Sequence, residues 1–121
     1  MQEGSIWEAA MSAAHYKLDN LIAFIDRNGL QIDGKTSDVM EIEPLGQKWK
    51  AFGWEVFHCD GHDHRQIAEI VDKAKAMKGK PSVIILKTIM GKGVKSIEGD
   101  YRWHGKAPTR AELDRFLEEL Y

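Results

Sequence analysis

Oxygen-bearing side chains cluster in the segment from Asp26 to Gly34. Asp26, Asn28 and Asp33 lie in or beside two Asx-Gly turns that directly follow an apolar run. Carboxylate, amide and main-chain carbonyl oxygens on a tight turn suit a hard divalent cation such as Mg²⁺. Asx-Gly pairs are also frequent in ordinary turns, so a plain turn is the alternative interpretation of this segment.

A second polar segment combines histidine, cysteine and aspartate. Its members are His58, Cys59, Asp60, His62, Asp63 and His64. These residue types bind zinc, but their spacing matches no standard structural zinc motif, and the sequence has only one cysteine. A turn followed by a helix that Asp63 caps is the preferred interpretation.

The third segment, from Met90 to Pro108, carries glycines and cationic side chains. Glycines in Gly91-Lys92-Gly93 allow the backbone to approach a phosphate closely, and a histidine or lysine in 103–106 binds phosphate directly. The spacing is neither a P-loop nor a dinucleotide-binding fingerprint. A solvated loop is the alternative, although a loop of about 18 residues more often serves a function.

Alternating helix and strand patterns would position these three segments. Apolar runs at 21–25 and 82–87 predict buried strands, and residues 54–58 alternate as a half-buried strand does. The expected helices begin at capping residues or proline: at Ser5 with Glu8, at Pro44, at Asp63, and at Thr109 with Glu112.

This order of elements predicts an α/β fold with a parallel sheet in three αβα layers. We expect residues 1–121 to form one such unit. Ligands of these sheets bind beyond the carboxyl ends of the strands, where the three polar segments lie. The run at 21–25 shows no alternation, so its strand is expected to be central rather than at an edge.

Composition excludes several classes of function. The sequence has 17 Lys+Arg and 19 Asp+Glu, and this net charge of −2 leaves no electrostatic footprint for nucleic acid or anionic lipid. The longest aliphatic and aromatic run, 21–25, is far shorter than the roughly 20 residues of a membrane helix. The N-terminal residues do not resemble a signal peptide. With one cysteine, the expected compartment is the cytoplasm.

Several short motifs follow one another in a recognisable order. They are Q-E-G-S-I-W-E-A at 2–9, D-R-N-G-L-Q-I-D-G at 26–34, G-W-E-V at 53–56, D-G-H-D at 60–63, K-T-I-M-G-K-G at 87–93 and W-H-G-K at 103–106. In this combination they resemble the thiamine-diphosphate-binding domain of transketolase, of the type found in N-terminal transketolase subunits. The resemblance covers essentially the whole chain.

The resemblance implies roles for particular residues. The Asn28 side chain and the Leu30 main-chain carbonyl would coordinate the divalent metal (Mg²⁺, Ca²⁺ or Mn²⁺) that holds the diphosphate. Ile32 would pack against the thiazolium ring, and Met90 would lie beside the cofactor. His104 would lie near the diphosphate and the hydroxyls of the donor substrate, where it orients them or moves a proton.

Two acidic residues, Glu3 and Glu8, match positions that enzymes of this family bury at a dimer interface near the cofactors. For Glu8, the capping box with Ser5 is an alternative role, and the two roles are compatible.

The resemblance starts just after the family motif G-D-G-E, whose aspartate is a principal metal ligand there. The upstream strands and the pyrimidine domain, with its cofactor-activating glutamate, also lie outside this sequence. We therefore expect the rear part of a cofactor domain with an unpaired sheet edge, inactive alone and dependent on a chain that carries the missing parts. A homo-oligomer is an alternative.

Three functions follow from the resemblance. The first is a component of a transketolase of the pentose phosphate pathway, which transfers a two-carbon ketol unit between sugar phosphates. The second is a non-catalytic interaction module or remnant that does not bind the cofactor. The third keeps the cofactor but changes the reaction, as in deoxyxylulose-phosphate synthases, although D-G-H-D and W-H-G-K look more like transketolase.

Overall fold

The computed structural model describes all 121 residues, which divide into two compact units. The first unit comprises Met1–Arg27 and Ile42–Lys87, and the second comprises Asn28–Glu41 and Thr88–Tyr121. None of the helices combines the length and apolar character that a membrane span requires.

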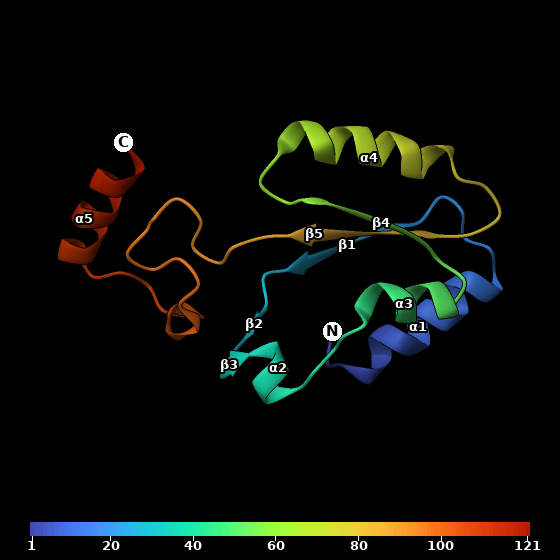
Figure 1. Cartoon of the computed structure of the whole chain (residues 1–121), viewed down its shortest axis with the longest axis horizontal. Helices are drawn as coiled ribbons and strands as arrows, with labels where there is room; N and C mark the ends of the chain where they lie inside the picture. The colour runs from blue at the N-terminus through green and yellow to red at the C-terminus, as the bar shows by residue number, and fades with distance from the viewer. The chain divides into compact units, whose positions relative to one another are not determined.

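A three-stranded parallel sheet forms the middle of the first unit, in the order β1-β5-β4 (Figure 1). The strands are β1 (Ile22–Arg27), β4 (Glu55–Asp60) and β5 (Ser82–Lys87). Ser82, at the start of β5, pairs with Ile22 of β1 on one side and with Glu55 of β4 on the other. The three expected strands are confirmed, and the bounds of β5 are as predicted.

Helices cover both faces of this sheet, which confirms the expected three-layer αβα arrangement (Figure 1). Alternate residues of β5 belong to different cores: Val83 and Ile85 pack in the cluster that contains Trp49, and Ile84 packs in the cluster that contains Ala74. The covering helices are α1 (Gly4–His15) and α3 (Leu45–Ala51) on one face and α4 (His64–Ala76) on the other.

Packing under α1 and α3 depends on tryptophans. The Trp54 indole N–H donates to the Ala10 carbonyl at 2.9 Å, which joins the start of β4 to α1. The rings of Trp49 and Trp54 meet edge to face with centroids 4.7 Å apart. Buried aromatic pairs in this geometry add stability beyond the area they bury. They therefore hold α1 and α3 together on one face of the sheet.

Within residues 1–121, the strand at 21–25 lies at an edge of the sheet and not at its centre. β1 pairs only with β5, and the central strand is β5. Phe24 of β1 is 51% exposed, whereas its partner in register, Ile84, is fully buried. An unbroken apolar run shows that both faces of a strand carry apolar side chains, but it does not specify how many strands pair with it. The expected unpaired sheet edge is present at β1.

The predicted Ser5–Glu8 capping box is wrong. α1 begins two residues earlier than that box requires, with Glu3 at the N-cap, and no side chain caps it. Ser5 therefore lies inside the first turn, where its hydroxyl is out of register with the backbone N–H groups that a capping box satisfies.

The second unit contains the predicted C-terminal helix, α5 (Arg110–Leu120), and short elements where the sequence predicted loops. The short elements are β2 (Leu30–Gln31) and β3 (Gly34–Lys35), which pair antiparallel, α2 (Thr36–Val39) and a 3-10 helix at Tyr101–Trp103. Strands of two residues and a helix of four are too short to give a periodic hydrophobic pattern, so the sequence does not predict them.

The start of α5 confirms the predicted capping box. The Thr109 hydroxyl accepts from the Glu112 N–H at 3.3 Å, and Glu112 Oε2 accepts from the Thr109 N–H at 2.8 Å. The Thr109 N–H and hydroxyl, followed by Lys106, lower the pKa of Glu112 to about 2. The carboxylate of Glu112 is therefore part of the native helix start.

Truncation of Ile84 to alanine should lower the free energy of unfolding by about 2–5 kcal/mol, because the fully buried side chain leaves a cavity under α4. Phe24→Ala is the control at the paired position, and its effect should be much smaller because half of that side chain is exposed. Urea unfolding followed by tryptophan fluorescence compares the two. Equal losses would mean that β1 is covered as completely as β5.

Replacement of Glu112 by glutamine should reduce the acid sensitivity of the protein. The folded-state pKa of Glu112, about 2, lies below its ordinary value of 4.5. The stabilisation from this carboxylate is thus fully present above pH 4.5 and is lost as the pH falls toward 2. Unfolding free energies measured between about pH 5 and pH 2 should fall less steeply for Glu112→Gln than for wild type. Glu118→Gln, exposed on the same helix, is the control, and an identical slope for both variants would contradict the prediction.

Candidate functional site

Asn28 opens the second unit, directly after β1 ends. Its Oδ1 atom accepts from the Leu30 N–H at 2.9 Å, which forms an Asx turn. The next residue, Gly29, has a φ of +78°, and its carbonyl accepts from the Thr36 N–H at 3.0 Å. A glycine suits this position because other residues rarely adopt such a φ. The sequence D-R-N-G therefore folds locally into a turn that fixes the Asn28 amide oxygen.

Ile32 lies at the tip of the hairpin between β2 and β3. Its side chain is 60% exposed, although it is a large apolar residue. The neighbouring Asp33 N–H donates to Gln31 Oε1 at 3.1 Å, which stabilises the tip. An exposed apolar side chain on a braced hairpin is suited to contact an apolar ligand surface.

The glycine segment after β5 is closed on itself. The Met90 carbonyl accepts from the Gly99 N–H at 2.9 Å, and the Gly93 N–H donates to Glu98 Oε1 at 3.0 Å. The same Glu98 oxygen lies 3.5 Å from Lys92 Nζ. The Gly93 N–H and then Lys92 hold the pKa of Glu98 below its ordinary value. In the glycine segment that the sequence suggested could approach a phosphate, the Gly93 N–H therefore already donates to a carboxylate.

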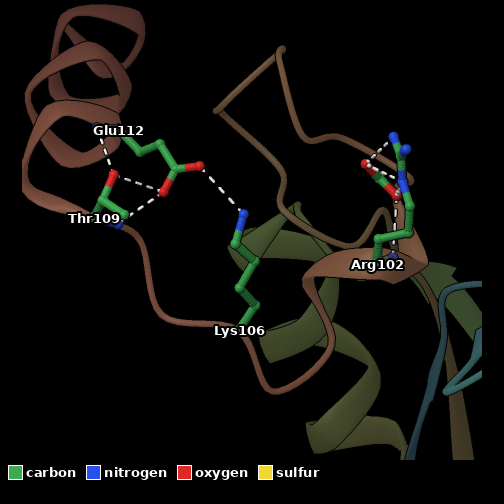
Figure 2. Close-up of polar contacts among 5 residues, drawn as sticks. Arg102, Lys106, Thr109 and Glu112 are labelled. Atoms are coloured by element: carbon green, nitrogen blue, oxygen red, sulfur yellow. Dashed lines mark hydrogen bonds and ion pairs between the residues drawn. The ribbon is translucent and has the colours of Figure 1, made fainter.

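His104 lies on a turn between the 3-10 helix and α5. Its backbone N–H donates to the Tyr101 carbonyl at 2.9 Å, and the following Gly105 has a φ of +71°. Asp100 caps the 3-10 helix through the Arg102 N–H and binds the guanidinium of Arg102 at 2.7 Å (Figure 2). The His104 side chain is exposed.

Lys106 contacts two groups of the same unit, and Figure 2 shows one of these contacts, with Glu112. Its Nζ lies 3.2 Å from Glu112 Oε1 and 3.8 Å from the centroid of the Trp103 ring. The sequence presented Lys106 as a phosphate ligand and Glu112 as a capping residue, without any link between them. The two residues lie six positions apart with a proline between them, so they do not have the spacing of an ion pair within one helix. The pair is therefore evident only in the folded structure.

The segment from 58 to 64 forms a turn and a helix cap, which is the interpretation that the sequence favoured over a zinc site. The Asp63 carboxylate accepts from the Arg65 and Gln66 N–H groups at 2.9 and 3.1 Å. Cys59 is buried, and burial followed by the charges of Asp60 and Asp63 raises the pKa of its thiol. No group of three His, Cys, Asp or Glu side chains in the chain is arranged to hold a metal ion. The zinc interpretation is therefore unsupported.

Five of the expected site residues fall in the second unit: Asn28, Leu30, Ile32, Met90 and His104. A cavity of about 710 Å³ in this unit is lined by both of its segments, with Leu30 among the lining residues. The expected interface residues Glu3 and Glu8 belong to the first unit and are exposed at the start of α1.

The donor chemistry fits a hard cation in part. The Asn28 amide and the Leu30 carbonyl are neutral oxygens of the kind that Mg²⁺ and Ca²⁺ bind. Two such oxygens do not complete a coordination shell of six, so further ligands must come from the diphosphate, water or another segment.

Comparison with known proteins identifies the family. The family model described as transketolase, thiamine diphosphate binding domain, matches residues 1–120. A Clostridium protein named 6-deoxy-6-sulfo-D-fructose transketolase subunit SqwG is 52% identical over 98% of this chain, which covers 43% of that protein. An apulose-4-phosphate transketolase subunit from Actinobacillus succinogenes is 48% identical over 98% of the chain, which covers 42% of that protein.

A solved structure gives the same result. The Pichia stipitis transketolase in complex with sedoheptulose-7-phosphate superposes with a TM-score of 0.89 and 31% identity, over 98% of this chain and 18% of that one. The present chain thus spans about two fifths of the length of the two curated relatives. Since the motifs, the fold and the family model agree, the chain belongs to the thiamine-diphosphate-binding domain family of transketolases.

Proposed function

We propose that residues 1–121 supply the rear part of a thiamine-diphosphate-binding domain to a transketolase that transfers two-carbon ketol units between sugar phosphates. The observation that carries the proposal is the Asx turn of Asn28, which fixes an amide oxygen beside the Leu30 backbone in the family motif. The curated relatives are named as transketolase subunits, which supports a division of this activity between chains.

Metal binding is the first role. Asn28 Oδ1 and the Leu30 carbonyl would hold a magnesium ion, which in turn would hold the diphosphate. The Asn28 amide oxygen accepts one hydrogen bond, from the Leu30 N–H, and a carbonyl-type oxygen has a second lone pair for a cation. The Asx turn fixes this oxygen before the metal arrives, so little side-chain entropy is lost on binding.

Cofactor contact is the second role. Bound thiamine diphosphate supplies a nucleophilic carbon that the side chains of this protein lack. The exposed Ile32 side chain would pack against the thiazolium ring, and the half-buried Met90 would lie beside the cofactor. Both side chains are apolar, so they would exclude water from that part of the site.

His104 would act on the substrate. Its exposed imidazole is available to the donor hydroxyls and to the diphosphate, and an imidazole can both accept and donate a proton. We assign to it the orientation of those hydroxyls or the movement of one proton at the reacting end of the sugar.

The missing parts of the site would come from a partner. A chain that carries the G-D-G motif and the pyrimidine domain would add the remaining metal ligand and the cofactor-activating glutamate. Glu3 and Glu8, exposed at the start of α1, would lie at the interface near the cofactors. The assembly would work in the cytoplasm, where a protein whose single cysteine is buried needs no disulfide.

Reconstitution with such a partner tests the proposal. The complex should catalyse ketol transfer only when thiamine diphosphate and Mg²⁺ are present. Asn28→Ala should weaken the apparent affinity for Mg²⁺ at least about tenfold, because a ligand oxygen is lost. Asn20→Ala, an exposed asparagine of the first unit, is the matched control. A correctly assembled complex without cofactor-dependent transfer would refute the proposal.

His104→Ala separates the role of this residue from cofactor binding. We expect kcat to fall by about 10²–10⁴, the range of general acid–base catalysis, while the Kd for thiamine diphosphate changes little. His64→Ala, exposed at the start of α4, should leave both quantities unchanged. Steady-state kinetics and cofactor titration give the two numbers. Parallel losses in kcat and cofactor affinity would contradict a role in proton movement.

A further inference from the structure

We propose that Lys106 and Glu112 are positioning residues that hold the His104 turn on the start of α5. The proposal deepens the function proposed above, because it rests on a role for His104 at the substrate. Neither side chain needs to touch substrate or cofactor, since both act through the backbone on either side of His104.

The N-terminal side of the turn is anchored by a ring contact. Trp103, directly before His104, packs edge to face on Phe116 of α5, with ring centroids 5.2 Å apart. Phe116 is 6% exposed and is the buried residue of α5. The Trp103 ring therefore attaches the turn to the side of α5 that is covered.

The C-terminal side is anchored by charge. Lys106, two residues after His104, places its Nζ 3.2 Å from Glu112 Oε1 and 3.8 Å from the centroid of the Trp103 ring. One ammonium group thus joins both anchors, because it contacts the ring before the turn and the helix after it. The Lys106 N–H also donates to the Trp103 carbonyl at 3.2 Å, which closes the turn around His104.

The Glu112 carboxylate uses both oxygens in this arrangement (Figure 2). Oε1 receives Lys106, and Oε2 receives the N–H and the hydroxyl of Thr109, each at 2.8 Å. The capping box fixes the rotamer of Glu112, so Lys106 meets a carboxylate that is already oriented. The start of α5 and the His104 turn are thereby parts of one hydrogen-bonded network.

The size of the effect follows from exposure. The Lys106 and Glu112 side chains are 48% and 25% exposed, and a solvent-screened ion pair of this kind contributes little to the stability of the fold. Its loss should therefore leave the chain folded. The position of a side chain at a reacting centre is far more sensitive, because a shift of about 1 Å can cost a factor of about 100 in rate.

The first test needs no activity. In the ¹⁵N-labelled 121-residue chain, Lys106→Met removes the charge but keeps an apolar stem against Trp103. The backbone order parameters of His104 and Gly105 should fall from about 0.85 toward 0.6, while the amide signals of α5 keep their positions. Glu112→Gln should have the same effect on the turn, and Lys106→Arg should restore wild-type order.

Lys92→Met is the matched control for this measurement. It breaks the ion pair between Lys92 and Glu98 in the same unit, whose side chains are 49% and 26% exposed, as in the Lys106–Glu112 pair. The order of the His104 turn should not change in this variant. Unchanged order parameters in both Lys106→Met and Glu112→Gln would overturn the proposal, whether or not the complex is a transketolase.

The second test uses the reconstituted complex. Lys106→Met should lower kcat by about tenfold with little change in the Kd for thiamine diphosphate, and Lys106→Arg should recover most of the loss. A wild-type complex without activity would refute the function proposed above and leave the NMR result standing. An active complex in which Lys106→Met keeps the wild-type kcat would overturn the positioning role.

Discussion

The pairing of β5 with a parallel strand on each side is the constraint on which the other elements depend. All four residues from Ser82 to Ile85 are buried, so both faces of β5 must be covered. Helices on both faces meet this requirement, and the crossovers that carry them return every strand in the same direction. The residues that end the three strands, Arg27, Asp60 and Lys87, consequently lie at the same end of the sheet.

The register of that sheet links the two segments of the second unit. Arg27 pairs with Lys87, so Asn28 and Thr88 both follow residues that face each other across adjacent strands. Beyond this point the structure relies on local contacts: an Asx turn, a capping box, and ion pairs near the surface. Each is at least partly exposed to solvent and contributes far less stability than the buried core of the first unit. Segments held in this way open at lower cost than core strands, which suits a site that must admit a cofactor.

Whether the sequence predicts a feature depends on how far apart along the chain the interacting residues lie. The helix starts at Asp63 and Thr109 depend on capping contacts within three residues, and the sequence predicts both. The apolar run of β5 is continuous in the sequence, which also predicts its bounds. The edge position of β1 depends on pairing with a strand about 60 residues away, which no local pattern reports. The Ser5–Glu8 box failed because a helix start displaced by two residues changes every capping partner. The local sequence D-R-N-G predicts the turn at Asn28. The Lys106–Glu112 ion pair, by contrast, can be found only in the folded structure.

Charge explains why the two oxygens proposed to bind a metal would form only half of a site. The Asn28 amide and the Leu30 carbonyl would orient a cation but neutralise none of its charge, and no cluster of three acidic, His or Cys side chains is arranged to do so. A divalent ion that exchanges water for two neutral oxygens gains little. The same ion gains much more when a diphosphate and a further carboxylate complete the shell, because charged ligands bind hard cations more strongly. Metal, cofactor and partner should therefore bind this unit as a coupled set, each raising the affinity of the others.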